Sequence, residues 1–374
     1  MDDARSLLIL LRGCASAGPL RALLDRFGDA RTALAAGPAA WRGAGIAAEQ
    51  FPRLLNPDAA RLEADLRWLG QSNHHLIGWH SADYPALLRR IAHPPAALFI
   101  LGDPDLLWHP QVAVVGSRHP SAGGRDNARQ FARAFGQSGL AVTSGLAEGI
   151  DTAAHLGALE THRTLAVIGT GPDLCFPASN EPLMARIAAG GAVISEHPPG
   201  TPGRREHFPS RNRLIAGLAL GTVVIEAAMR SGALITARLA AESGREVFAL
   251  PGSIHNPLAR GCHRLIRQGV GLVETPAEVI EALAPVAADL AQALRGRLET
   301  VDRPASDDAP ANPVGTRPAG PEQAVRQAMG HDPVNLDQLA ERTGLTVAAL
   351  SAMLLAMELE GQISVEHGRY TRRS

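Results

Sequence analysis

Short hydrophobic runs alternate with helix-length segments through the middle of the chain, from residue 111 to about 285. The runs are rich in β-branched residues and bounded by glycine: Val112–Val115, Ala141–Thr143, Leu165–Ile168, Val193–Ile194, Val223–Ile225, Val247–Leu250 and Gly271–Val273. Continuous apolar runs are typical of strands buried on both faces, and parallel strands need helical crossovers between them. The pattern therefore predicts an α/β fold with a parallel sheet covered by helices on both faces.

The first hundred residues show helical spacing instead. Apolar residues recur at helical intervals in Leu7–Leu11, Leu20–Phe27, Ala30–Ala36 and Ala59–Leu69, and Gly-Pro pairs interrupt the pattern. We expect a small helical domain of the SAM or helix-hairpin-helix kind over residues 1–80, followed by the sheet domain over residues 81–290.

A Gly-x-Gly turn lies inside this helical region, in Arg42-Gly43-Ala44-Gly45-Ile46. It is similar to the hairpin of helix-hairpin-helix DNA modules, in which backbone N–H groups at a helix start approach a phosphate. Such turns also join packed helices without binding a ligand, so the sequence leaves both interpretations open.

The C-terminal part begins with a Pro-rich segment that lacks an apolar period, and we expect a linker over residues 291–320. Three helices are predicted after it, at Glu322–Met329, Leu336–Arg342 and Val347–Glu358, and then a hairpin over 361–370. This order predicts a winged-helix-like domain over 321–374. Its seven acidic and five basic residues give a net charge of −2, so contact with protein is supported at least as well as contact with DNA.

Composition narrows the possible functions. The 374 residues are enough for two or three domains, and 36 basic residues nearly balance 37 acidic ones. The chain has no lysine, which excludes a Walker A P-loop, a protein kinase site, a Schiff-base aldolase and a pyridoxal enzyme. Cys14, Cys175 and Cys262 form no C-x-x-C pair, so we expect neither a disulfide framework nor a metal site. The acidic start and the absence of a long apolar stretch predict a cytoplasmic protein that does not enter a membrane.

Serine and glycine follow most of the predicted strands. Parallel sheets bind ligands at the carboxyl ends of their strands, and Ser and Gly let the backbone approach an anion closely. The sequence therefore predicts an anion-binding rim that includes Gly116, Ser117, Arg118, Ser144, Gly145, Gly171, Ser231, Gly232 and Thr236. No G-x-G-x-x-G follows the first strand, so no nicotinamide cofactor is expected.

A basic loop runs between the fourth and fifth of these seven strands. Four arginines, Arg204, Arg205, Arg211 and Arg213, stand there against Glu206, with Phe208 among them. Arginines around an aromatic residue suit binding of a nucleic-acid strand, because a base can stack on the aromatic ring while the arginines pair with the phosphates. Equally, Phe208 could fix the loop to the sheet while the arginines are solvated or cap helices.

Catalytic patterns are few. No G-x-S-x-G, H-E-x-x-H or metal-spaced His pair occurs. Asp151 can act as an acid or base or simply begin a helix, and His155 fits packing within that helix. Glu196 and Glu226 would form a carboxylate pair only if the fold brings them together. We expect no catalytic residue.

Five motifs, taken in their order along the chain, resemble those of one family, the DprA (Smf) DNA-processing proteins of bacteria. The resemblance covers roughly residues 80–280. These motifs are Gly116-Ser117-Arg118, the segment Ser144–His155, the segment Phe208–Gly217, Glu226 with Ser231–Ala237, and Pro251-Gly252 with Gly261 and Leu265-Ile266. The sequence departs from the family pattern at Gly123, Phe176, His263 and Arg205, where the family often has an aromatic residue, Tyr, Asn and Lys.

The resemblance implies an extended Rossmann-like core that binds single-stranded DNA, forms homodimers and loads the recombinase RecA onto incoming DNA during natural transformation. It implies no cofactor and no catalysis. By motif position, Arg118 would contact a phosphate and Phe208 would stack on a base. Arg205, Arg211 and Asn212 would line the path of the strand.

The alternative is a nucleotide-hydrolysing enzyme. Related Rossmann-like proteins use a Pro-Gly-Gly-x-Gly-Thr loop and a glutamate. This chain would have to use Glu226 with the loop at Ser231-Gly232, and it has Met229-Arg230-Ser231-Gly232-Ala233 where the glycine-rich loop would lie.

Overall fold

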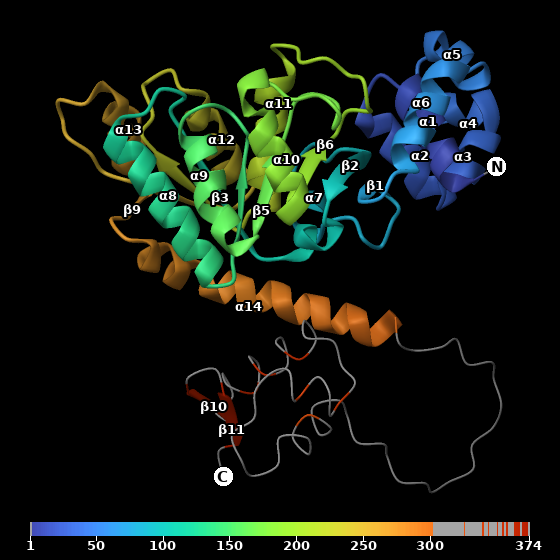
Figure 1. Cartoon of the computed structure of the whole chain (residues 1–374). Coiled ribbons are helices and arrows are strands. Elements are labelled where there is room, and N and C mark those ends of the chain that lie inside the picture. Colours follow the sequence, from blue (N-terminus) through green and yellow to red (C-terminus); the bar gives the residue numbers. More distant parts are fainter. Residues whose placement is uncertain are drawn as a thin grey trace, which may run out of the picture. The chain divides into compact units, whose positions relative to one another are not determined.

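The computed structural model describes residues 2–301, and beyond them Val325, Leu339, Thr343, Leu350, Leu354, Met357, 363–366 and 369–372. The chain divides into two compact units, Met1–Asp302 and Arg303–Ser374. The first unit contains an N-terminal group of helices and a nine-stranded sheet, which Figure 1 shows side by side.

The N-terminal helices are short and pack around one apolar core. They are α1 (Asp3–Gly13), α2 (Ala17–Phe27), α3 (Ala30–Ala35), α4 (Gly37–Gly43), α5 (Phe51–Leu55) and α6 (Ala59–Leu69). Leu10, Leu23 and Trp41 are almost fully buried in this core. The four helices predicted from apolar spacing are present, and α4 and α5 are additional.

The hydrogen bonds of the Gly-x-Gly turn, which follows the end of α4, disfavour its phosphate interpretation. The N–H groups of Ala44 and Gly45 bond the carbonyls of Ala40 and Arg42, each at 3.0 Å, and the Ile46 N–H bonds that of Trp41 at 3.0 Å. These amides are therefore occupied within the turn. Gly45 adopts a φ of +90°, which allows the sharp turn, and Ile46 after it is buried in the helical core.

The sheet has the order β1-β2-β6-β5-β4-β3-β7-β8-β9. The seven predicted strands are confirmed and all run parallel to one another: β3 (Gln111–Gly116), β4 (Ala141–Ser144), β5 (Thr164–Val167), β6 (Ala192–Ser195), β7 (Gly221–Ile225), β8 (Glu246–Ala249) and β9 (Gly271–Leu272). Two further strands, β1 (His74–Gly78) and β2 (Ala97–Gly102), extend one edge and pair antiparallel to each other. Both come from the segment expected to be helical, and that expectation is corrected for them.

Side chains along each strand alternate between two helical layers. Val112 and Val114 pack with Phe131 and Phe135 of α8 (Ala122–Gln137), and α9 (Ile150–Ala158) and α14 (Pro276–Val301) cover the same face. Ala113 and Val115 face the opposite layer, formed by α7 (Ala86–Arg89), α11 (His207–Leu218), α12 (Gly232–Glu242) and α13 (Arg260–Arg267). A separate apolar cluster seats α10 (Glu181–Gly190) against β5 and β6. The predicted doubly covered parallel sheet is thus confirmed.

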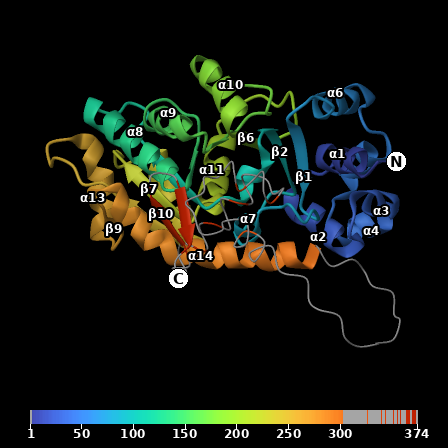
Figure 2. The ribbon, with the colours of Figure 1, turned by 60° about the horizontal axis from the view of Figure 1, so that its bottom comes forward.

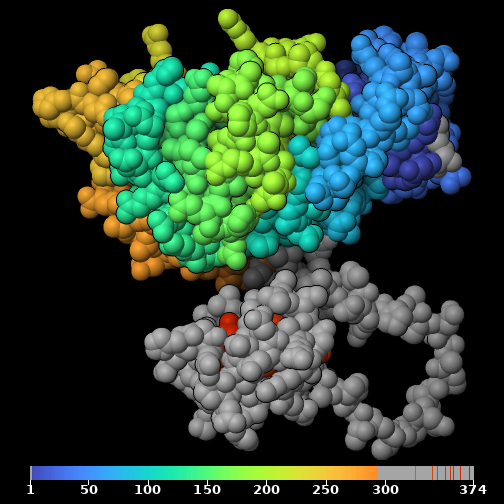
Figure 3. Space-filling view, in the orientation of Figure 1, coloured from blue at the N-terminus to red at the C-terminus, as the bar shows by residue number. Residues whose placement is uncertain are grey.

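Figures 1 and 2 place the N-terminal helices beside β1 at one edge of the sheet and α13 with β9 at the opposite edge. In the space-filling view, the surface of the N-terminal helices meets the sheet domain along that edge (Figure 3). The described helices include none long and apolar enough to cross a membrane.

The segment after residue 290 begins as helix, because α14 continues to Val301. The linker expected from residue 291 therefore does not start there, and the remainder of that expectation lies outside the described residues. In the second unit, β10 (Ile363–Glu366) and β11 (Arg369–Arg372) form the predicted hairpin. The three predicted helices of this unit lie almost wholly outside the described residues.

Candidate nucleic-acid interface

A groove of about 760 Å³ lies at the carboxyl ends of β3 and β7. Loops that are far apart in the sequence form its walls, as expected where parallel strands end at one edge. It contains ten of the predicted binding residues: Gly116, Ser117, Arg118, Arg205, Phe208, Arg211, Asn212, Ser231, Gly232 and Thr236.

The turn after β3 presents Arg118 to this groove. A side chain at Gly116 would collide with the carbonyl oxygen of Ile225, so only glycine fits where β3 meets β7. The Ser117 carbonyl accepts a hydrogen bond from the Ile150 N–H at 3.0 Å, which ties the turn to the start of α9. Arg118 is exposed, and its guanidinium makes no hydrogen bond or ion pair within residues 2–301. The backbone of Arg118 is therefore fixed, while its charged side chain stays unpaired in the groove.

Two phenylalanine rings lie together in the wall. Phe208, the second residue of α11, and Phe176, from the loop after β5, have ring centroids 5.1 Å apart and planes inclined by 40°. Phe176 is 52% exposed, and Phe208 is half-buried. The sequence marked Phe176 only as a departure from the family pattern, yet an aromatic exposed in a loop has no core to fill. The pair forms an open aromatic surface.

Arg211 has a different environment from the one expected. Its side chain is buried, and Nη1 donates to the Gly145 carbonyl at 2.6 Å and to the Val167 carbonyl. Burial lowers the pKa of Arg211 to about 10, which leaves it charged near neutral pH. We therefore assign Arg211 to holding the ends of β4 and β5 against α11, in place of the expected phosphate contact.

Asp151 lies beside this guanidinium. Burial raises its pKa, although the charge of Arg211 and the N–H groups of Ala147 and Gly145 act in the opposite direction. The Gly145 N–H donates to Asp151 at 3.1 Å. Asp151 thus fixes the β4 loop, a structural role that fits its first-turn position in α9.

Three predicted rim residues lie outside the groove. Ser144 is fully buried and its hydroxyl donates to the Val114 carbonyl at 2.7 Å. The Gly171 N–H donates to the Thr201 carbonyl at 2.8 Å, so this amide supports a neighbouring loop. Gly145 lines a smaller adjoining cavity of about 230 Å³, together with Arg118, Phe176 and Phe208.

The basic loop contributes fewer free cations than its sequence indicates. Arg204 and Arg205 are exposed, and Arg205 lines the groove. Arg213 instead forms a two-bonded ion pair with Glu196, at 2.6 and 2.5 Å, and both side chains are largely buried. Although burial alone would raise the pKa of Glu196, bonding to Arg213 lowers it.

The structure adds one cation that the sequence analysis did not select. Arg230 is exposed in the loop after β7 and lines the groove. In the sequence, its position next to the predicted rim residues Ser231 and Gly232 was the feature that indicated this role. Ser231 caps α12 by accepting from the Ala233 N–H at 3.2 Å, so the N-terminal end of this helix also borders the groove and favours an anion there.

Glu226 lies outside this groove. Its carboxylate accepts from the Ser121 N–H at 2.7 Å, the Ser121 hydroxyl at 2.5 Å and the Asn256 amide at 3.0 Å. It lines a separate cavity of about 190 Å³. Both oxygens are thus engaged, which disfavours its use with the Ser231-Gly232 loop. His155 is buried against Thr164, with its ring Nδ1 2.7 Å from the hydroxyl, and burial lowers its pKa to about 3.

Comparisons with known proteins identify the family of this chain. The DNA recombination-mediator protein A family matches residues 75–284, and the DprA winged helix domain matches residues 306–369. Protein Smf of Escherichia coli K12 is 40% identical over 330 residues, which are 88% of this chain and 85% of that protein. The DNA processing protein DprA of Streptococcus pneumoniae is 48% identical over 198 residues, 53% of this chain and 70% of that protein.

Solved structures give the same result. The X-ray structure of DprA from Streptococcus pneumoniae aligns with a TM-score of 0.64 at 36% identity, over 75% of this chain and 98% of that chain. DNA processing protein A from Helicobacter pylori, described for its single-stranded DNA binding mode, aligns with a TM-score of 0.51 at 27% identity, over 54% of this chain and 93% of that one. The chain therefore belongs to the DNA recombination-mediator protein A family and carries a DprA winged helix domain after its sheet domain.

Proposed function

We propose that this protein binds single-stranded DNA in the groove at the carboxyl ends of β3 and β7. The observation that carries the proposal is the open pair Phe176 and Phe208 beside three exposed arginines, Arg118, Arg205 and Arg230. Every base has a flat π-face, so an aromatic surface binds single strands with little sequence preference. Arginines along the same groove neutralise the phosphates between stacked bases.

We further propose that the protein acts as a non-catalytic recombination mediator. It would protect incoming single-stranded DNA during natural transformation and load RecA onto it, working as a homodimer in the cytoplasm. This part rests on membership of the family, together with the binding described for the Helicobacter pylori relative. The bonded state of Glu226 supports binding without hydrolysis.

Fluorescence anisotropy with a labelled oligothymidylate tests the binding proposal, and the same sequence as a duplex is the comparison. We expect tighter binding of the single strand and an affinity that falls linearly with salt on a log–log scale. Equal binding of the duplex would contradict the stacking surface.

Incubation with nucleoside monophosphates tests the enzymatic alternative. Release of free base by the wild type, lost on Glu226→Gln, would favour the hydrolase. We expect no release.

A further inference from the structure

A second cavity lies among the N-terminal helices, between α1, α5 and α6, and encloses about 480 Å³. Each of these helices contributes one arginine to its lining: Arg12, Arg53 and Arg61. The one acidic residue in the lining is Asp58, and Asp65 pairs with Arg12 from behind, so the three arginines less these two carboxylates leave a net charge of +1. Leu8, Ile9 and Leu62 supply apolar wall.

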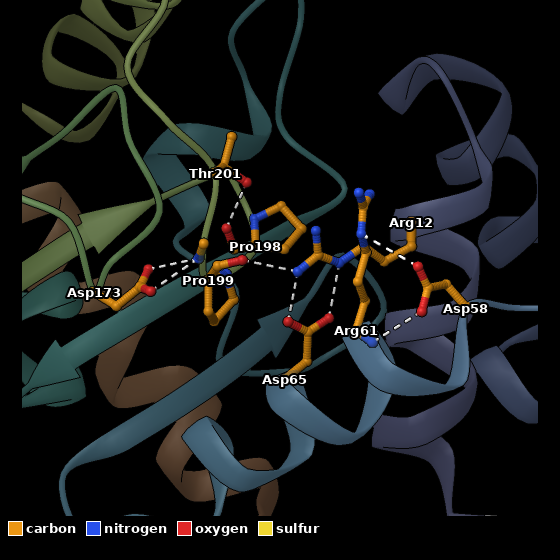
Figure 4. Close-up of polar contacts among 9 residues, drawn as sticks. Arg12, Asp58, Arg61, Asp65, Asp173, Pro198, Pro199 and Thr201 are labelled. Carbon is orange, nitrogen blue, oxygen red and sulfur yellow. Dashed lines mark hydrogen bonds and ion pairs between the residues drawn. The ribbon is translucent and has the colours of Figure 1, made fainter.

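Arg12 is held in a fixed position. Its Nε and Nη2 donate to the buried carboxylate of Asp65 at 2.8 and 2.6 Å, and Nη2 also donates to the Pro199 carbonyl at 2.8 Å (Figure 4). Nη1 makes no hydrogen bond to the described residues, so the outer edge of this guanidinium retains two N–H donors. A bidentate pair locks the donors in direction, which suits recognition of a tetrahedral anion.

The other two arginines are easily available. Arg61 pairs with Asp58 at 3.3 Å while both side chains are more than half exposed, and such surface pairs contribute little energy. Arg53 is exposed and forms no ion pair within residues 2–301. An arriving phosphate could therefore take guanidinium donors from three helices with small loss of existing contacts.

The cavity adjoins the basic loop of the DNA groove. Pro199, which bonds Arg12, lies in the turn that leads from β6 to Arg205 and Phe208. The opposite side of this turn is fixed by Asp173, whose carboxylate accepts from the Gly200 N–H at 2.8 and 2.9 Å (Figure 4). The turn after β6 thus joins the two sites, because its Pro199 carbonyl bonds Arg12 of the cavity while Arg205 and Phe208 further along the chain line the groove.

We propose that this cavity is a second phosphate site, which binds the backbone of the same DNA strand after it leaves the groove. The proposal rests on the proposed function. It implies that the N-terminal helices lengthen the binding site, so that long oligonucleotides gain affinity that short ones lack. A free nucleotide presents the same phosphate chemistry, and the test separates the two sources.

The experiment compares oligothymidylates of about six and about twenty nucleotides by anisotropy. The variant is Arg53→Ala with Arg61→Ala, and the matched control is Arg31→Ala with Arg67→Ala. The control removes the same charge from exposed positions outside the cavity. We expect the cavity variant to bind the short oligomer within twofold of wild type and the long one about tenfold more weakly. Its salt slope on the long oligomer should fall by about 1.4, for two lost phosphate contacts. The control should bind both oligomers as wild type does.

Three results would overturn the inference. The cavity variant and its control could weaken long-oligomer binding equally, which would show a general charge effect. The variant could retain the affinity and salt slope of wild type on the long oligomer. Finally, calorimetry could show thymidine monophosphate binding wild type but not the variant while the gain with length persists, which would assign the cavity to a free nucleotide. Absence of any oligonucleotide binding by wild type is a separate result, because it contradicts the groove itself.

Discussion

The rings of Phe176 and Phe208 lie with centroids 5.1 Å apart, although the two residues are 32 positions apart in the sequence. Phe176 comes from the loop after β5 and Phe208 from the first turn of α11, which follows β6, so the pairing of β5 with β6 brings them together. Aromatic pairs in inclined arrangements stabilise each other by about 1 kcal/mol. Each ring therefore holds the other in place at the edge of the groove.

A double-mutant cycle tests this relationship. Phe176→Ala should weaken single-strand binding by about 1 kcal/mol, because it removes one stacking ring and loosens the other. The loss in the double alanine variant should be smaller than the sum of the two single losses, since the rings act as a unit. Strictly additive losses would show that the rings bind DNA independently.

Arg118 and Arg230 are expected to act through charge. Changing either to alanine should weaken binding of all sequences and reduce the log–log salt slope by about 0.7. Arg238→Ala is the matched control, because Arg238 is exposed on α12 and pairs with Glu242 outside the groove. Salt titrations decide the point. A slope for Arg230→Ala equal to that of the control would remove Arg230 from the phosphate path.

Arg211 should instead behave as a structural residue. Arg211→Ala leaves the carbonyls of Gly145 and Val167 and the carboxyl of Asp151 without their buried partner. We expect a loss of about 3 kcal/mol in the free energy of unfolding, measured by urea denaturation. Arg205→Ala, an exposed member of the same loop, should leave stability unchanged. An unaltered Arg211→Ala stability with a flatter salt slope would restore its direct phosphate contact.

His155 makes stability depend on pH. Burial lowers its folded-state pKa from 6.5 to about 3, so between these values the unfolded chain binds the extra proton. The stabilisation is fully present above pH 6.5 and decreases as the pH falls, by about 2 kcal/mol at pH 5. His155→Gln removes this group, so its stability should fall less than that of wild type between pH 7.5 and 5. Equal decreases in the two proteins would contradict the neutral, buried state of His155.

The sequence predicts the parallel core because its strands are continuous β-branched runs between glycines. It does not predict β1 and β2, which are an antiparallel edge pair. Each of these two strands contains a single β-branched residue, Ile77 in β1 and Ile100 in β2. Both segments therefore fit helix or strand equally well until tertiary pairing selects one.

The same limit applies to the site. Arg205 and Arg211 look alike in a basic loop, but Arg211 shares a helical face with Leu214 and Ile215, and this i, i+3, i+4 spacing buries it. This spacing could have predicted from the sequence that Arg211 is buried. The contact of Phe176 with Phe208, by contrast, joins the loop after β5 to the first turn of α11, and no local sequence pattern predicts such a contact.

The most direct test of the account is the affinity of Phe208→Ala for an oligothymidylate, measured from low to high salt beside wild type and Phe208→Tyr. Stacking carries no charge. We therefore expect Phe208→Ala to lose about 1–3 kcal/mol of binding with its salt slope unchanged, while Phe208→Tyr binds as wild type does. The melting temperature of Phe208→Ala should fall only by the few degrees that correspond to loss of one ring pair, about 1 kcal/mol. Unchanged affinity in Phe208→Ala, or a slope and melting temperature that fall together with affinity, would contradict single-strand stacking in this groove.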